Sequence, residues 1–234
     1  MMNSKSWWCS ALAILFGVSG LVGESHGAEN DVARTRVVCF GDSITAGAYP
    51  DLLGEMDGRF EIISAGVGGN TTGAGLKRME TDVLAKDPDV VLIMFGTNDS
   101  VLRGPKQYRT PGPAFKENLQ SMVDQCREKG ATPILATLLP IMETPYYTRH
   151  PKEYYDPDGG LQAIVARYRA ITIALAEELK VPVVDMNQLI AGDETHLKPD
   201  GVHPNGAGEK AIATHFLDAL NALSETESKA SPKP

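Results

Sequence analysis

Short apolar runs alternate along the chain with segments in which apolar residues recur every three or four positions. Each run is only a few residues long and is bounded by glycine, proline or polar residues, which is typical of strands buried on both faces of a sheet. The runs lie at residues 35–40, 59–64, 89–95, 132–138 and 181–184. The pattern therefore predicts five buried strands.

Between the runs, the apolar residues follow the spacing of one helix face. This spacing occurs at residues 76–83, 115–126, 161–179 and 211–223. Gly130 follows the second of these segments, at a position where helices commonly end. Strands that alternate with helices predict an α/β fold with right-handed crossovers. We expect a three-layer α/β/α, doubly wound domain around a five-stranded parallel sheet.

The two ends of the chain are expected to lie outside this domain. Residues 1–28 have the order of a signal peptide, with Lys5, an apolar run at 7–18 and small residues after it. The alternative, an uncleaved membrane anchor, would require a longer apolar run. Residues 224–234 are polar and contain proline, so we expect a disordered tail there. The predicted domain spans residues 29–223.

The composition fits one globular domain and limits its partners. The chain has 234 residues, of which 42% are hydrophobic and 22% charged, enough for a core of ordinary size. Its formal net charge of -8 at pH 7 repels nucleic acid and anionic lipid, so we expect no nucleic-acid partner. No segment after the signal peptide is apolar for long enough to span a membrane, so we expect no span after cleavage.

Cys39 and Cys126 remain after the expected cleavage. One disulfide between them is arithmetically possible in an oxidising compartment. Both lie at apolar positions, one in a predicted strand and the other in a predicted helix, so we expect two free, buried thiols. Neither cysteine belongs to a pattern typical of metal or redox chemistry.

Glycine-containing loops with reactive or hydrogen-bonding side chains follow the first three predicted strands. In open α/β sheets the ligand site lies at the carboxyl ends of the strands, so these loops are expected to converge on one edge. Ser43 lies in the first loop, Gly69 in the second and Asn98 in the third. A further loop near the C-terminus contains Asp200 and His203.

These residue types suit acyl transfer. A serine hydroxyl is a weak nucleophile that needs a base within hydrogen-bond reach, and histidine side chains in general titrate near neutrality. His203 is the candidate base for Ser43, and Asp200, three residues earlier, can approach its Nδ1 atom. A tetrahedral intermediate also needs donors for its oxyanion. The candidates are the N–H groups of Ser43 and Gly69 and the side-chain amide of Asn98.

The residues around these positions resemble the SGNH hydrolases, the GDSL-type lipases and acylhydrolases. Each block alone is a weak signal, whereas four blocks in the family's order, each at a predicted loop, are a specific one. The resemblance extends from Val37 to the last predicted helix. The blocks are Gly-Asp-Ser-Ile-Thr at 41–45, Gly-Gly-Asn-Thr-Thr at 68–72, Gly-Thr-Asn-Asp at 96–99 and Asp-Gly-Val-His-Pro at 200–204.

The resemblance implies a flavodoxin-like sheet and a role for each residue. Ser43 is the implied nucleophile, His203 its base and Asp200 the residue that orients the base. Gly69 and Asn98, together with the N–H group of Ser43, are the implied oxyanion donors. No metal or organic cofactor takes part in such enzymes, so none is expected here.

Structural explanations compete with these roles. Ser43 could be a helix N-cap and Asn98 could brace a turn. Asp42 and Asp99 are interpreted as structural residues of their loops. Asn70 stands where many members of the family carry Asp. This departure affects a supporting position and leaves the four key residues intact.

Residues 140–160, an insert after the fourth predicted strand, are rich in tyrosine. The insert can overhang the candidate site, where tyrosine rings could stack on sugar rings or border an acyl pocket. Alternatively, the rings pack on one another, and the sequence leaves both interpretations open. The tyrosines are Tyr146, Tyr147, Tyr154 and Tyr155.

The sequence thus predicts a secreted or periplasmic serine ester hydrolase that works through an acyl-enzyme. By analogy with one branch of the family, the expected substrate is an O-acetyl group on a carbohydrate. The alternative within the family is a lipase, lysophospholipase or thioesterase, which would need a larger apolar acyl pocket. The alternative of another class is a non-catalytic carbohydrate-binding module on a hydrolase scaffold, because a fold alone does not fix function.

Overall fold

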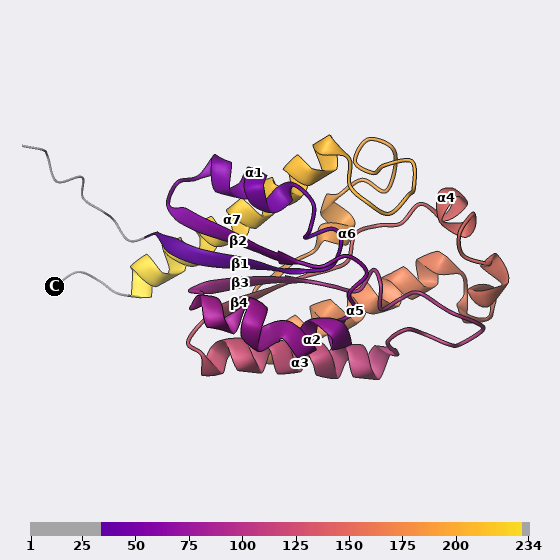
Figure 1. Cartoon of the computed structure of the whole chain (residues 1–234), viewed down its shortest axis with the longest axis horizontal. Coiled ribbons are helices and arrows are strands. Elements are labelled where there is room, and N and C mark those ends of the chain that lie inside the picture. Colours follow the sequence, from indigo (N-terminus) through magenta and orange to yellow (C-terminus); the bar gives the residue numbers. More distant parts are fainter. Residues whose placement is uncertain (1–33, 231–234) are drawn as a thin grey trace, which may run out of the picture. The chain divides into compact units, whose positions relative to one another are not determined.

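A five-stranded parallel sheet forms the centre of the protein (Figure 1). The computed structural model describes residues 34–230 and orders the strands β2-β1-β3-β4-β5, with every neighbouring pair parallel. The strands are β1 (Thr35–Gly41), β2 (Phe60–Gly66), β3 (Val90–Met94), β4 (Thr132–Ala136) and β5 (Val183–Val184). The fold class expected from the sequence is therefore confirmed, and its strand boundaries shift by only a few residues.

The position of β1 between β2 and β3 determines where a site can form. The chain runs from β1 to one neighbour and then crosses back to the other, so the direction of winding reverses at β1. In doubly wound sheets, ligands bind at such a reversal, beyond the carboxyl ends of the strands. The pairs Gly41↔Gly66 and Gly41↔Met94 bring all three strands to an end at the same level.

Helices cover both faces of the sheet and complete the three layers (Figure 1). One face is covered by α1 and α7, the other by α2, α3 and α5. The helices are α1 (Tyr49–Met56), α2 (Thr72–Asp82), α3 (Gly112–Glu128), α4 (Glu143–Tyr147), α5 (Leu161–Leu179), α6 (Met186–Leu189) and α7 (Gly206–Ala230). Short 3-10 turns lie at η1 (Leu84–Lys86), η2 (Lys152–Tyr154) and η3 (Asp156–Asp158).

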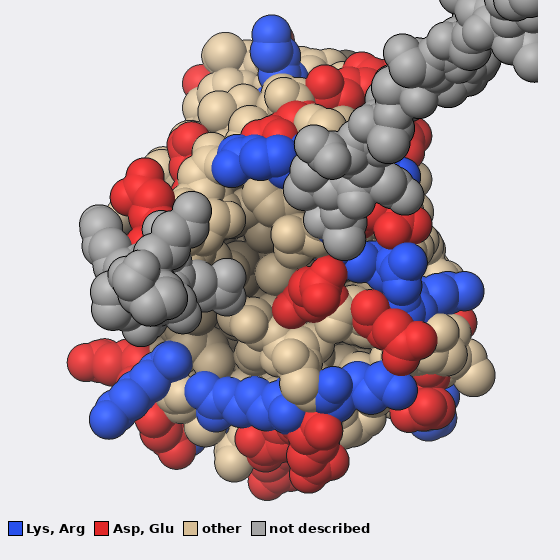
Figure 2. Space-filling view, turned by 90° about the vertical axis from the view of Figure 1, so that its left-hand side faces the viewer, with Lys and Arg blue, Asp and Glu red and all other residues tan. Residues whose placement is uncertain are grey.

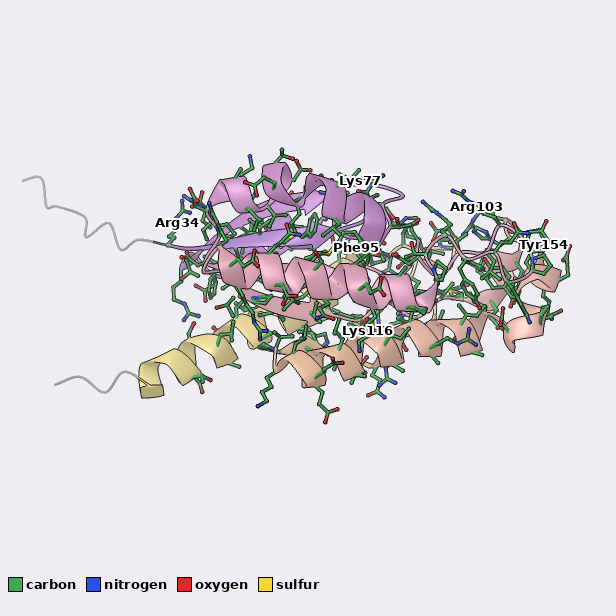
Figure 3. All side chains as sticks on the ribbon, turned by 90° about the horizontal axis from the view of Figure 1, so that it is seen from below. Arg34, Lys77, Phe95, Arg103, Lys116 and Tyr154 are labelled. Atoms are coloured by element: carbon green, nitrogen blue, oxygen red, sulfur yellow. The ribbon has the colours of Figure 1, made fainter. Side chains whose placement is uncertain are left out.

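Alternate residues of β1 face two separate cores. Val38 and Phe40 pack with the helices α2, α3 and α5, whereas Val37 and Cys39 pack with α1 and α7. All four side chains are completely buried, because successive residues of a strand point to opposite faces and both faces are covered. On the first face, Phe95 contacts Phe40 edge to face and lies between the sheet and its helices (Figure 3). This two-sided burial explains why the strand segments are apolar throughout.

The two described cysteines are free and buried, as the sequence predicted. Cys39 belongs to the core beneath α1 and α7, and Cys126 to the core on the other side of the sheet. Burial raises the pKa of each thiol to about 12, so both stay protonated at neutral pH. They act as small apolar residues of the two cores.

Where the sequence led us to expect a disordered tail at 224–234, α7 continues to Ala230. Between Ser224 and Ala230 the chain has neither glycine nor proline, so each further residue adds a helical hydrogen bond at little cost. The hydroxyl of Ser224 also donates to the Leu220 carbonyl of the preceding turn. Residues 231–234 and the predicted signal peptide at 1–28 lie outside the described residues. None of the helices in the described range is long and apolar enough to cross a membrane.

At the end of the described domain where the strands begin, basic and acidic side chains are interspersed (Figure 2). In this view, several Lys and Arg side chains lie in a row across the lower part of the face, with Asp and Glu side chains above and below them.

Candidate active site

Ser43 follows β1 in a tight turn held by Asp42. The side chain of Asp42 accepts a hydrogen bond from Ile44 N at 3.0 Å, and its carbonyl oxygen accepts one from Ala46 N at 3.0 Å. Ser43 is partly exposed, whereas its neighbours Asp42 and Ile44 are buried. The turn therefore leaves the Ser43 hydroxyl accessible at the carboxyl end of β1.

Asp200 and His203 contact Ser43 from the loop that precedes α7. Ser43 Oγ lies 2.9 Å from His203 Nε2, and His203 Nδ1 lies 2.7 Å from Asp200 Oδ2. The other carboxylate oxygen of Asp200 accepts hydrogen bonds from Val202 N and His203 N at 2.8 and 2.9 Å. The structure thus brings together three residues that the sequence analysis singled out, and the Asp200 carboxylate is fixed by its own loop.

The charge of Asp200 determines which nitrogen of His203 carries a proton. Burial opposes ionisation of this carboxyl, but the backbone N–H groups of His203 and Val202 and the imidazole outweigh it, so the pKa of Asp200 lies below its usual range. An ionised carboxylate only accepts hydrogen bonds, so the facing Nδ1 of His203 is the protonated nitrogen. Nε2 is then free to accept the Ser43 proton, the arrangement that general-base catalysis on a serine requires.

Two backbone N–H groups in this region, those of Ser43 and Gly69, have no hydrogen-bond partner within residues 34–230. Gly69 has a φ of 75°, a conformation that favours glycine. A Cβ atom on Gly69 would meet nothing within 4 Å, so its backbone conformation and not a lack of space requires glycine. A Cβ atom on Gly68 would lie 4.0 Å from Ser43 Cβ, which places this loop against the serine.

The side chain of Asn98 is held in one orientation by two charged residues. Its Nδ2 atom donates to Asp42 Oδ2 at 3.1 Å, and its Oδ1 atom accepts from Arg109 Nη1 at 3.1 Å. Exchanging the oxygen and nitrogen of the amide would place donor against donor and acceptor against acceptor. The second hydrogen of Nδ2 is left for another acceptor, such as an oxyanion.

The buried carboxyls of Asp42 and Asp99 support the loops, as the sequence analysis expected. Burial raises the pKa of Asp42 from 3.8 to about 6, although Ile44 N and Asn98 Nδ2 donate to it. Asp99 accepts hydrogen bonds from the backbone and the hydroxyl of Thr72, at 2.9 and 2.6 Å to Oδ1. Asp99 therefore joins the loop after β3 to the start of α2.

Two arginines that the sequence analysis did not identify hold the loops together. Arg78 of α2 donates to the Gly41 and Ala65 carbonyls, each at 2.8 Å, and so joins the ends of β1 and β2. Its Nε atom donates to Asn70 Oδ1 at 2.8 Å. Asn70, which stands where many members of the family carry Asp, therefore helps to hold the loop after β2. Arg109 joins the loops after β2 and β3. No sequence pattern marks such residues, because the fold determines which backbone carbonyl groups and side-chain oxygens they reach.

The tyrosines of the insert pack on one another. Tyr146 and Tyr155 are buried, and their hydroxyl oxygens lie 2.8 Å apart. Tyr147 meets both rings edge to face, and Tyr154 packs against the same core. Of the two interpretations left open by the sequence, the structure favours the insert packed by its own tyrosines. In Figure 1, the insert with α4 lies at the end of the domain where the strands end.

The charged groups of the site are engaged by hydrogen-bond donors of the protein. Within residues 34–230, no group of three or more His, Cys, Asp or Glu side chains is arranged to hold a metal ion. Asp42 and Asp200 each accept hydrogen bonds from backbone N–H groups of their own loops. The arrangement is suited to proton transfer and to stabilising a negative oxygen.

The sequence also matches a known family of ester hydrolases. The model of the GDSL-like Lipase/Acylhydrolase family matches residues 39–211, a range that contains every candidate site residue named above. The chain belongs to this family. It is a GDSL-type esterase, a hydrolase that acts on ester bonds.

Two relatives and one solved structure show how far the similarity of this GDSL-type esterase extends. The "Uncharacterized lipoprotein YqeF" of Bacillus subtilis (strain 168) is 36% identical over 168 residues, 64% of this chain and 69% of that protein. The "Thioesterase 1/protease 1/lysophospholipase L1" of Escherichia coli (strain K12) is 26% identical over 204 residues, 82% of this chain and 86% of that protein. The crystal structure of the acetyl xylan esterase AlAXEase is 25% identical with a TM-score of 0.64, covering 79% of this chain and 99% of that chain.

The burial of Asp42 predicts a pH dependence of stability. Burial raises the pKa of this carboxyl from 3.8 to about 6, so the folded state binds the proton more tightly than the unfolded state does. As pH rises from about 4 to about 7, wild-type protein loses stability at this site, whereas Asp42→Asn has no proton to lose. We expect the unfolding free energy of the variant, relative to wild type, to rise by about 1–3 kcal/mol over this range in urea unfolding experiments.

The matched control is Asp218→Asn, which removes an exposed carboxylate of α7. A difference in unfolding free energy between Asp42→Asn and wild type at a single pH does not test the prediction, because the variant also changes the contact with Asn98. The test is how this difference changes with pH. A relative stability of Asp42→Asn that does not change with pH, or that only follows the control, would show that Asp42 is ionised equally in the folded and unfolded chains.

Proposed function

We propose that this esterase hydrolyses its substrate through an acyl-enzyme on Ser43, with His203 as the base and Asp200 as the residue that orients it. The observation that carries the proposal is the continuous hydrogen-bonded series from Ser43 Oγ to His203 Nε2 and from His203 Nδ1 to Asp200 Oδ2, at 2.9 and 2.7 Å. These contacts meet the geometric requirement for an activated serine.

In the first half of the reaction, Ser43 Oγ attacks the ester carbonyl and its proton passes to His203 Nε2. The bond to the leaving oxygen then breaks, and the imidazolium gives its proton to the departing alcohol. In the second half, His203 takes a proton from water, whose oxygen attacks the acyl-serine. The bond between the acyl group and Ser43 Oγ then breaks, the imidazolium returns its proton to Ser43 Oγ, and the acid is released. The carboxylate of Asp200 stabilises the imidazolium in both halves and keeps its own charge.

The oxyanion of each tetrahedral intermediate is proposed to lie among Ser43 N, Gly69 N and Asn98 Nδ2. The first two groups are supported by their lack of partners within the described range, and the third by the hydrogen bonds that fix its orientation. Donors that are already oriented need no rearrangement when the charge develops. One such donor contributes about 10²–10³-fold to the rate in well-studied hydrolases.

The substrate class that we propose is a short acyl ester, an O-acetyl group on a carbohydrate. The similarity to an acetyl xylan esterase structure along 79% of this chain supports this choice. Family membership with the complete set of serine, histidine and aspartate also favours an enzyme over the alternative of a carbohydrate-binding module.

A longer acyl ester is the second candidate, and one feature of the structure favours it. An apolar groove of about 560 Å³ lies between the start of α3 and α5, beside the loop that carries Arg109. Tyr108, Tyr168 and Ile171 line it together with Lys116, which is labelled in Figure 3. Such a groove could take the acyl chain of a lysophospholipid or thioester, the substrates named for the relative from Escherichia coli.

We also propose that the protein is exported. The order of charged, apolar and small residues within 1–28 supports export, as does the relative named a lipoprotein. When the full chain is produced in a bacterium, N-terminal sequencing of the exported protein is expected to start near Gly27 or Ala28. Recovery of the intact N-terminus in the membrane fraction would favour the anchor instead.

Replacing the nucleophile tests the proposed chemistry. We expect Ser43→Ala to lower kcat on para-nitrophenyl acetate by at least about 10³-fold, because the acyl-enzyme cannot form. The midpoint of urea unfolding should stay close to that of wild type, since Ser43 is partly exposed. Ser224→Ala, on the far end of α7, is the matched control and should keep full activity. Activity above about one per cent of wild type in Ser43→Ala would refute the nucleophile role.

Acyl-chain length separates the two substrate candidates. With para-nitrophenyl acetate, butyrate and octanoate, we expect kcat/KM to fall by at least about tenfold from acetate to octanoate. If kcat/KM instead rises with chain length, the acetyl ester proposal is wrong. Ile171→Trp, which fills the apolar groove, would then lower octanoate hydrolysis and leave acetate hydrolysis unchanged, whereas Leu189→Trp on exposed α6 would alter neither.

A further inference from the structure

Arg109 contacts both of the non-serine residues proposed to bind the oxyanion. Its Nη1 atom donates to Asn98 Oδ1 at 3.1 Å, and its Nη2 atom donates to the Gly69 carbonyl at 2.7 Å. A guanidinium group is planar and rigid, so its two donors fix the distance and the angle between their acceptors. One side chain therefore couples the loop after β2 to the loop after β3.

We propose that Arg109 is a positioning residue that holds Gly69 and Asn98 in register for the oxyanion. This inference rests on the proposed function of the site. Asn98 rotates about its side-chain torsions, and Gly69 lies in an exposed loop with a positive φ, so neither donor is held by its own backbone element. Without Arg109, Gly69 would lose the hydrogen bond to its carbonyl and Asn98 would be held by Asp42 alone. Part of the ordering of the two donors would then take place during the reaction, at a cost in rate.

The charge of Arg109 adds to this effect. Its two described acceptors are an amide oxygen and a carbonyl oxygen, and it forms no ion pair within residues 34–230. The positive charge is therefore not cancelled by a neighbouring carboxylate in that part of the chain. A positive charge behind oriented donors favours the build-up of negative charge on the substrate oxygen.

A short hairpin carries Arg109 to this position. The hairpin starts just after Asn98, its two arms pair through an antiparallel bridge between Leu102 and Tyr108, and Arg109 N donates to the Val101 carbonyl at 2.9 Å. Thr110 N then donates to the Asp99 carbonyl at 3.2 Å and closes the loop beside its starting point. The backbone thus returns Arg109 to the neighbourhood of Asn98.

The tyrosine-rich insert supports the hairpin from behind. Leu102 N donates to the hydroxyl of Tyr155, which is completely buried and is itself paired with the hydroxyl of Tyr146. On the other arm, Tyr168 of α5 donates to the Thr110 carbonyl. Figure 3 shows Arg103 of the hairpin and Tyr154 of the insert at the same end of the domain. The insert therefore supports the hairpin that places Arg109 against Gly69 and Asn98.

Steady-state kinetics tests the inference with a matched pair of variants. Arg109→Ala removes the coupling, and Arg103→Ala removes an exposed arginine of the same hairpin whose side chain has no hydrogen bond within the described range. On para-nitrophenyl acetate, we expect Arg109→Ala to lower kcat by about 10²-fold with KM within a factor of about two, and Arg103→Ala to match wild type. Arg109→Lys, which cannot span both acceptors with one ammonium group, should recover only part of the loss.

Chemical rescue separates positioning from a general loss of structure. Millimolar guanidinium chloride should restore a substantial part of kcat to Arg109→Ala, whereas equal concentrations of ammonium or potassium chloride should not. The urea unfolding midpoints of Arg109→Ala and Arg103→Ala should agree. An unchanged kcat, or a raised KM with an unchanged kcat, would overturn the inference, the latter because Arg109 would then bind the substrate directly.

Hydrogen exchange supplies a readout that does not depend on esterase activity. The peptide that covers residues 66–71 should exchange its amide hydrogens faster in Arg109→Ala than in Arg103→Ala. The Gly69 carbonyl loses its hydrogen bond to Arg109, and the loop whose Val67 and Asn70 N–H groups are hydrogen-bonded then opens more often. If Arg109→Ala exchanges faster than Arg103→Ala but the wild-type protein has no esterase activity, the proposed function is refuted and the positioning of the loop by Arg109 is not. Equal exchange in the two variants would refute the positioning role, whatever the activity of the wild-type protein.

Discussion

The common level at which β1, β2 and β3 end determines where each polar group of the site can lie. Gly41 pairs with Gly66 on one side and with Met94 on the other, so the three following loops leave the sheet side by side. A Cβ atom on Gly66 would lie 2.1 Å from Ala46 N, which shows that the loops after β1 and β2 pack backbone against backbone. Ser43, Gly69 and Asn98 therefore come from adjacent loops although they are far apart in the sequence.

Hydrogen bonds from charged side chains hold these loops together. Backbone carbonyl groups at the end of a parallel sheet lose their strand partners and must be satisfied in another way. Arg78 donates to the Ala65 carbonyl and to the Gly41 carbonyl, which also accepts from Val67 N at 3.2 Å. Arg109 donates to the carbonyl of Gly69 in the loop after β2. Asp42 connects the turn of Ser43 to Asn98. The site is thus a set of loops fixed by directional contacts, and such contacts can orient hydrogen-bond donors more closely than apolar packing alone.

The fold and the main site residues could be predicted from the sequence because each depends on a local pattern. Buried strands are apolar runs, and the residues after parallel strands meet at one edge, which is enough to place Ser43 and Asn98 together. The roles of Arg78 and Arg109 could not be predicted, because their acceptors are set by the fold and any residue type supplies a carbonyl group. The packing of Tyr146 on Tyr155 and the helix beyond Ser224 likewise depend on tertiary contacts and on helix propagation, which periodicity does not report.

The central claim is that Ser43 is the nucleophile of an acyl-enzyme esterase, and a serine-directed phosphonate tests it most directly. The mature chain is treated with the phosphonate while para-nitrophenyl acetate hydrolysis is followed, and the protein is then analysed by mass spectrometry. The account predicts that activity disappears as one adduct forms, and that peptide mapping places this adduct on Ser43. Full hydrolysis without an adduct, or an adduct on another residue that accompanies the loss of activity, would contradict it.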